Sequence, residues 1–291
     1  MDLGHLLGLA ATDHPLRWRQ IVSSAVCTPA GALQGGAALA AAIEATQASA
    51  QRPVRWATGQ YLSHVAAQSV VDLEVSILVN GPHLSQARCT MRCDEVEILL
   101  MMAALGTRPF AHEAVWPRPP QVPSPADCPE RAVPGASEGT LLEMCERRAA
   151  QGRSYPEVDG KPGPGRSATW IRLPGGARMV SAGDLALVGD FLMVEFTDAL
   201  GVACTGNSLD NTVRVARLVT TEWILLDAHI QTVTGGLGYG MAHLWAEDGT
   251  LLGTASQTLA LRTLEPDGTL PSRRRRIVGR DATAASSPPG A

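Results

Sequence analysis

One carboxylate in this 291-residue chain stands in a segment that is otherwise apolar. Asp190 lies between Leu187-Val188 and Phe191-Leu192, in a stretch expected to form a buried helix. Burying a carboxylate costs free energy unless it is hydrogen-bonded or neutralised, and carboxylates with perturbed pKa values gather at functional sites. Asp190 is therefore a candidate for acid–base chemistry. The alternative is a structural aspartate that caps a helix beginning after Gly189.

Two further polar residues follow Asp190 in predicted strands. Gln257 interrupts an apolar strand, where a buried amide needs several hydrogen-bond partners, so a structural hydrogen bond is the alternative to a functional role. Ser208 stands at the expected start of a strand, and serine there is common in turns. Asp210 is two residues further on and should share a face with Ser208 if the strand is regular. It could hold a turn or line a pocket.

These residues belong to a pattern of elements that occurs twice. In the first half, Gly35-Gly36 open an alanine-rich helical run to Ile43; in the second, a helix is expected from Asp184 to Leu200. Predicted strands follow each helix. They cover 55–63, 69–79, 85–93 and, ambiguously, 96–106 in the first half, and 212–218, 223–232, 238–245 and 251–262 in the second.

A buried helix followed by an antiparallel meander, twice over, predicts an α+β fold of two tandem hot-dog modules. Each sheet should curl around its helix and leave an outer face for pairing with its twin. Asp248-Gly249 predicts a hairpin between the last two strands, with a type I′ turn in which both central residues have positive φ.

Proline-rich sequence divides the chain. Seven prolines between 111 and 135 predict a linker, which separates an N-terminal module at 1–110 from a C-terminal module at 138–271. The linker itself is placed at 111–137. The end, 272–291, contains Arg273 to Arg276 and is predicted to be a disordered basic tail.

Composition narrows the functional class. The formal net charge is −4, so nothing general favours nucleic-acid binding, and no apolar run reaches the length of a membrane span. Without a signal-like start, a cytoplasmic location and reduced cysteines are expected. Cys89 and Cys93 share a strand face without completing a zinc set, and His229 and His243 have no evident ligand set around them. No metal site and no cofactor are predicted.

Several short motifs together resemble the acyl-CoA thioesterase II type of double hot-dog proteins. The similarity covers most of both halves and is firmest in the second. The motifs are Gly35-Gly36, Trp170-Ile171-Arg172, Leu187-Val188-Gly189-Asp190-Phe191-Leu192, Ser208-Leu209-Asp210, Glu222-Trp223-Ile224-Leu225-Leu226, Asp248-Gly249 and Ala255-Ser256-Gln257.

The resemblance implies hydrolysis of an acyl-CoA thioester by water that Asp190, Ser208 and Gln257 position. Gly189 would allow close approach of backbone N–H groups to the oxyanion, and Asp210 is a secondary candidate. The first-half counterparts of the trio would be Gly36, Tyr61 and the stretch around Met101 and Met102, which would shape the pocket rather than act on water. The resemblance also implies a homodimer or larger homo-oligomer.

Two other functions fit the same fold. A protein could bind acyl-CoA or another small ligand without turnover, because fold does not determine function. A hot-dog hydratase or dehydratase would need a histidine close to the aspartate on the catalytic segment. Met193 to Phe196, which follow Asp190, include none, and this weighs against that reaction.

Overall fold

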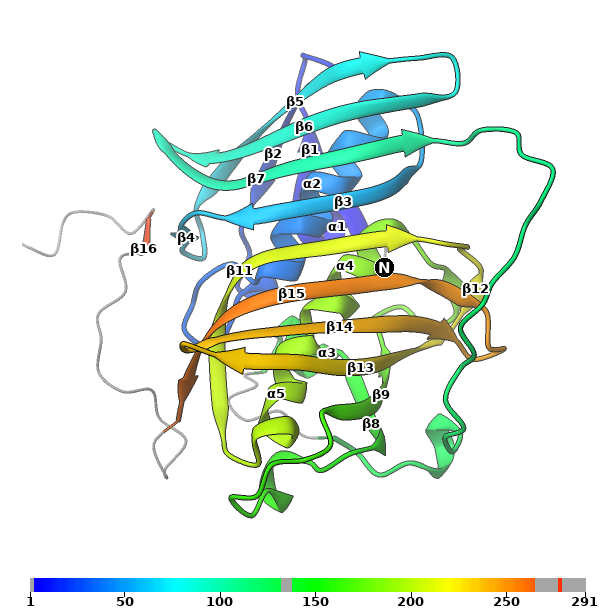
Figure 1. Ribbon diagram of the computed structural model, residues 1–291. Helices are drawn as coiled ribbons and strands as arrows, with labels where there is room; N and C mark the ends of the chain where they lie inside the picture. The colour runs from blue at the N-terminus through cyan, green and yellow to red at the C-terminus, as the bar shows by residue number, and fades with distance from the viewer. Residues whose placement is uncertain (1–2, 132–137, 265–276, 279–291) are drawn as a thin grey trace, which may run out of the picture.

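The computed structural model describes residues 3–131, 138–264 and 277–278 (Figure 1). Twelve strands form one antiparallel sheet in the order β1-β2-β5-β6-β7-β3-β11-β15-β14-β13-β9-β8. The helices α2, α4 and α5 lie together on one face of it (Figure 1). The apolar core fills the space between these helices and the sheet.

The first half contributes six strands of the sheet and its central helix. Helix α2 (Gly35–Ala50) is buried along most of its length, and its alanines let it lie close against the strands. The short helix α1 spans Leu3–Leu7. The strands are β1 (Leu9–Ala11), β2 (Arg17–Ile21), β3 (Val54–Tyr61), β5 (Val70–Asn80), β6 (Leu84–Cys93) and β7 (Val96–Gly106), with β4 (His64–Val65) outside the sheet.

The second half repeats this arrangement. Its sheet strands are β8 (Glu146–Gln151), β9 (Arg166–Arg172), β11 (Cys204–Val215), β13 (Trp223–Thr234), β14 (Leu237–Ala246) and β15 (Leu251–Thr263). The helices are α3 (Leu141–Met144), α4 (Ala182–Asp190) and α5 (Leu192–Leu200), and β10 (Arg178–Met179) pairs with β12 (Thr220–Thr221). Short 3-10 turns occur at Ser24–Val26, Pro125–Asp127 and Tyr155–Glu157.

The double hot-dog prediction is confirmed, with one correction to how the halves meet. They join edge to edge, because β3 and β11 pair through backbone hydrogen bonds at the centre of the sheet. The sequence had instead predicted pairing through an outer face of each sheet. Edge pairing satisfies the backbone groups of two strands that would otherwise be exposed edges.

The predicted second helix is two helices. α4 ends at Asp190 and α5 begins at Leu192, with Phe191 between them, so Asp190 is the last residue of a helix rather than an interior one. Ser181 and Asp184 form a capping box at the start of α4. The ends of the two helices therefore present Asp190 at a break in the helical path.

The hairpin at Asp248-Gly249 is confirmed, but its turn type was wrong. Gly249 has φ of +81°, whereas Asp248 is absent from the residues with positive φ. The Gly249 amide donates to Ala246, and the Ala246 amide donates to Thr250. This pattern is a longer hairpin loop in which a single glycine takes the left-handed conformation.

Part of the expected linker is packed on the second half. Cys128 is buried, and Val122 packs with it beside Trp170 and Trp245 on the face of the sheet opposite the helices. The arginine at position 131 forms a buried ion pair of 2.9 Å with Glu195 of α5. Residues from about 122 onward thus contribute to the folding of the second module.

Most of the expected basic tail, including Arg273 to Arg276, lies outside the described residues. Two of its residues, Ile277–Val278 (β16), pair in parallel with β4. No helix in the described part of the chain is long and apolar enough to cross a membrane.

Candidate active site

The carboxylate of Asp190 is held by both halves of the protein. Its Oδ2 accepts a hydrogen bond of 2.9 Å from the backbone N–H of Gly36, at the start of α2. Its Oδ1 accepts a hydrogen bond of 2.7 Å from Gln257 Nε2 on β15. The first N–H groups of a helix have no partner within it and favour negative charge. The start of α2 therefore stabilises a carboxylate supplied by the other half.

Gln257 also connects Asp190 to Ser208. The same Nε2 donates to Ser208 Oγ at 2.7 Å, so the three polar residues predicted from the sequence form one hydrogen-bonded group. The Gln257 side chain is fully buried, and these two hydrogen bonds offset the cost of placing its amide nitrogen within an apolar strand. With its oxygen occupied as an acceptor, the Ser208 hydroxyl keeps its proton for donation to another group.

Desolvation raises the pKa of Asp190 above the ordinary aspartate value. The Gly36 amide is the strongest opposing influence, followed by the side chains of Gln257, Gln34 and Ser208, all of which favour the charged form. A carboxylate with a raised pKa is a stronger base than an exposed one. The fixed donors nevertheless keep it from being an isolated buried charge.

The internal repeat shows what occupies the equivalent site of the first half. Gly36 and Asp190 are 154 positions apart, as are the hydrogen-bonded Thr58 and Thr212 of the central strand pair. The same spacing relates the strand pair Ala57–Ala103 to the pair Asn211–Gln257. Ala103 is thus the counterpart of Gln257, next to the predicted Met101 and Met102.

The sequence predicted Tyr61 as the first-half counterpart of Ser208, and this prediction was wrong. The structure places Val54 at the equivalent position. A bulge follows Val54 in β3, and a bulge follows Ser208 in β11 at the equivalent place. Val54 is 1% exposed and Ala103 is 1% exposed, so both pack in the core. The prediction that the first half has no polar trio holds with these corrected residues.

The bulge at Leu209 also separates Asp210 from the trio. Ser208 pairs with Leu259 and Asp210 with Thr258, so these two residues of β11 point to opposite faces of the sheet. The Asp210 carboxylate accepts a 3.0 Å hydrogen bond from the Thr258 backbone N–H. The expected shared face assumed a regular strand, and Asp210 instead secures the pairing of β11 with β15.

Asn211 takes the inward position that Asp210 does not. Its side chain is fully buried opposite Gln257 in the strand register. Its side-chain amide lies near the Tyr61 hydroxyl and opposes the rise in the pKa of Tyr61. Asn211 was not predicted from the sequence, because only the bulge turns it toward the helices.

The two predicted glycines allow close packing. A Cβ on Gly36 would lie 2.7 Å from Asp190 Cβ, and one on Gly189 would lie 2.8 Å from Ala255 Cβ on β15. Gly36 thus leaves room for the catalytic candidate. Gly189 lets the end of α4 approach the sheet, and the contact found for it is with a strand rather than with the cavity.

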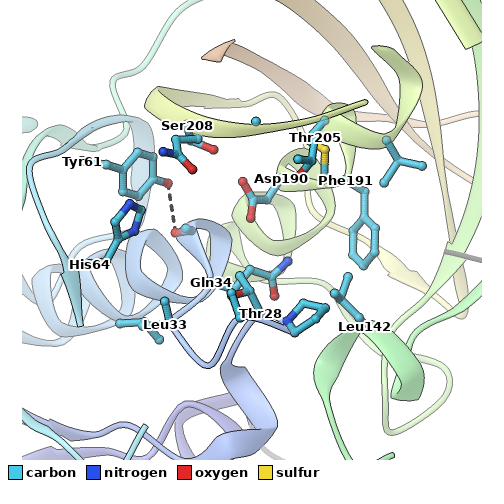
Figure 2. Close-up of a pocket in the computed structure, with 18 of the residues that line it drawn as sticks. Thr28, Leu33, Gln34, Tyr61, His64, Leu142, Asp190, Phe191, Thr205 and Ser208 are labelled. Carbon is cyan, nitrogen blue, oxygen red and sulfur yellow. Dashed lines mark hydrogen bonds between the residues drawn. The ribbon is translucent and has the colours of Figure 1, made fainter. Parts of the chain in front are cut away.

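A cavity of about 330 Å³ opens beside Asp190 and is lined by both halves. Tyr61 and His64 enter it from first-half strands, whereas Asp190, Phe191 and Ser208 enter from the second half (Figure 2). Tyr61 donates a 2.9 Å hydrogen bond to the Gly35 carbonyl. Its pKa is raised by burial and by the nearby Asp190 carboxylate, so it remains a neutral phenol. His64 was not predicted, because β4 is too short to leave a strand pattern.

Comparisons with known proteins agree with this geometry. Residues 125–261 match the family model of the acyl-CoA thioesterase C-terminal domain. A solved structure from Novosphingobium aromaticivorans, assigned as a thioesterase, shares 32% sequence identity with a TM-score of 0.77, over 87% of this chain and 97% of that one. No curated protein sequence matches the chain.

More distant structures support the fold alone. The tesB protein of Mycobacterium avium subspecies paratuberculosis is 22% identical with a TM-score of 0.74, covering 89% of this chain and 98% of that one. A hot-dog protein from Alicyclobacillus acidocaldarius is 18% identical with a TM-score of 0.77, covering 91% and 98%. The family match and the relative of 32% identity show that this chain belongs to the acyl-CoA thioesterase II type of double hot-dog proteins and is a thioester hydrolase.

Proposed function

We propose that the protein hydrolyses an acyl-CoA thioester with a water molecule that Asp190, Ser208 and Gln257 hold in place. The observation that carries this proposal is the shared donor: Gln257 Nε2 lies 2.7 Å from both Asp190 Oδ1 and Ser208 Oγ. The carboxylate of Asp190 and the hydroxyl of Ser208 are thereby fixed at the wall of one cavity by an amide that is buried behind them. Pre-positioning of this kind lowers the entropic cost of bringing water to the thioester.

Asp190 acts as the general base. It takes a proton from the bound water as the oxygen attacks the thioester carbonyl, and the carbon–sulfur bond breaks when the tetrahedral intermediate collapses. The proton then passes to the departing thiolate, so the products are the free acid and CoA. Ser208 is neutral and orients the water without exchanging a proton, while Gln257 holds Asp190 and Ser208 in position.

The developing oxyanion needs fixed donors, and the start of α2 can supply one. Gly36 directs its N–H to Asp190, while Gly35 precedes it in the same turn and lines the cavity. N–H groups of a first helical turn are the usual oxyanion donors when they face a dry site. We assign this role to Gly35, in place of the Gly189 region expected from the sequence.

The acyl group lies in the cavity between the halves. Leu33 and Ile98 of the first half and Leu142 and Phe191 of the second give it apolar walls. Tyr61 closes the wall near α2 through its hydrogen bond to Gly35. The CoA moiety remains toward the protein surface.

The test is release of CoA thiol from short, medium, long and aromatic acyl-CoAs by the wild type and by Asp190→Asn. Loss of a general base lowers the rate by about 10²- to 10⁴-fold. Asp72→Asn is the control, since Asp72 pairs with Arg19 on an exposed part of the first-half sheet. It should leave turnover unchanged.

Each result has a distinct meaning. Loss of turnover in Asp190→Asn with an unchanged circular dichroism spectrum supports water activation by Asp190. An equally active Asp190→Asn protein contradicts it. Saturable binding of acyl-CoA by the wild type without turnover on the whole panel would instead establish the ligand-binding alternative.

A further inference from the structure

A cluster of three metal-ligating side chains lies on the face of the sheet opposite the active site. Asp227 and His229 are two residues apart on β13, and His243 pairs with Asp227 from β14. Their neighbours Leu226, Ala228 and Leu244 point to the other face, into the core beneath the helices. Because side chains alternate along a strand, the cluster and the hydrolytic trio are on opposite sides of the sheet.

The spacing within the cluster suits a divalent cation. His229 Nε2 lies 3.2 Å from Asp227 Oδ1, and His243 Nδ1 lies 3.8 Å from Asp227 Oδ2. One ligand atom from each of the three residues lies within 4.8 Å of the others. Ligands of tetrahedral zinc at 2.0–2.1 Å are separated from one another by about 3.3 Å. Small side-chain rotations therefore bring all three to one ion.

The surroundings orient the ligands and leave access from solvent. Trp245 Nε1 donates to Asp227 Oδ2 at 3.4 Å, and the Trp245 ring packs against His243 at 5.7 Å between centroids. Hydrogen bonds to ligating groups are the usual support of a metal site. The side chains of Asp227, His229 and His243 are 15%, 24% and 23% exposed, so an ion can enter and a water can complete its coordination.

We propose that Asp227, His229 and His243 bind one Zn²⁺ ion, with water as the fourth ligand, and that this ion links β13 to β14. Two imidazoles and one carboxylate form a common ligand set for zinc. This differs from the absence of a metal expected from the sequence, where the two histidines lie fourteen positions apart and their pairing across strands is hidden. The ion stabilises the sheet, and hydrolysis proceeds on the other face without it.

The test is isothermal titration of the untagged, metal-stripped protein with Zn²⁺. We expect one ion bound per chain, and at least about a 10-fold loss of affinity in His229→Gln and in His243→Gln. His83→Gln is the matched control, since His83 is an exposed histidine outside the cluster. Titration with Co²⁺ provides a second readout, because its visible absorption reports tetrahedral coordination with nitrogen and oxygen ligands.

Thermal unfolding separates a specific site from loose association. At a Zn²⁺ concentration about 100 times the Kd, the wild-type Tm should rise by about 5 °C, while the Tm of His243→Gln should not change. Thiol release should be the same with and without the ion. Absence of saturable Zn²⁺ binding, or equal affinity in wild type and His243→Gln, would overturn the proposal and leave the cluster as a hydrogen-bonded carboxylate between two imidazoles.

Discussion

The two halves of the molecule share a fold but differ at three equivalent positions. The second half has Asp190, Ser208 and Gln257, whereas the first half has Gly36, Val54 and Ala103 at the positions 154 residues earlier. Three small or apolar residues thus stand where the second half carries a base, a hydroxyl and an amide. Only one of two similar frameworks carries the groups for chemistry.

The symmetry of the fold explains why the difference is so complete. Repeat-related positions 36 and 190 face each other, and a Cβ on Gly36 would lie 2.7 Å from the Cβ of Asp190. There is room for one side chain, and two carboxylates there would repel each other. The first half therefore contributes a backbone N–H where the second contributes a carboxylate. A single site results, because the contact between the two repeat-related positions has room for one carboxylate.

Among the changes that leave the Asp190 base in place, the largest effect should come from replacing Gln257 with its first-half counterpart, alanine. Gln257→Ala removes the donor to both Asp190 and Ser208, and we expect kcat to fall by about 100-fold, as for loss of one fixed donor in other active sites. Steady-state kinetics of thiol release measure it. The reciprocal change Ala103→Gln should give no new activity and should destabilise the protein by about 1–3 kcal/mol, because the amide lacks partners. Full activity in Gln257→Ala would show that the trio does not act as a unit.

A methyl group at Gly36 should disturb the contact between the halves. We expect Gly36→Ala to lower kcat by about 10-fold through displacement of Asp190. Overpacking should also destabilise the fold by about 1–3 kcal/mol. Gly189→Ala is the comparison, since it crowds Ala255 on the sheet and should affect stability more than kcat. Urea unfolding and kinetics on both variants separate the two effects, and equal kcat values in the two variants would contradict the special role of position 36.

Ser208 should contribute less than Gln257. Its hydroxyl accepts from Gln257 and remains free to donate to water, so Ser208→Ala should lower kcat by about 3- to 10-fold, equivalent to one neutral hydrogen bond. Ser208→Thr keeps the hydroxyl and should recover most of the rate. A threonine variant as slow as the alanine variant would assign the effect to packing instead of hydrogen bonding.

The smallest effect should be on stability, through the raised pKa of Asp190. A folded-state pKa above the unfolded one means that the folded protein holds this proton more tightly. The favourable contribution is complete below the unfolded pKa and is lost as the pH rises through the folded pKa. Above the folded-state pKa, the free energy of unfolding of Asp190→Asn should equal that of the wild type or exceed it by up to about 1 kcal/mol. Urea unfolding at several pH values tests this, and a variant that weakens steadily relative to the wild type as the pH rises would contradict it.

The same pKa shift has a kinetic consequence for the wild type. The active form needs a deprotonated Asp190, so kcat/KM should fall on the acid side at a higher pH than an ordinary aspartate would give. The pH profile of thiol release measures this limb, and Asp72→Asn serves as the control that should leave it in place. An acid limb at the ordinary aspartate value would contradict the desolvated environment of Asp190.

Much of the framework could be predicted from local patterns. Alternating Val, Ile and Thr residues predicted most of the long strands, and the glycine at position 249 predicted the last hairpin. Short edge strands such as β1 and β8 were missed, because a few residues give too little periodicity. The break between α4 and α5 was also missed, since both helices are apolar on nearly every side.

The sequence alone determined which residue types are available for chemistry, because a buried carboxylate and a buried amide stand out wherever apolar residues surround them. Tertiary structure decided their partners. The bulge at Leu209 turned Asp210 away and Asn211 inward, and the repeat placed the Gly36 N–H against Asp190. Both outcomes depend on strand register and on contacts across 154 positions of sequence. Such contacts are absent from local residue patterns, which report only the preferences of neighbouring residues.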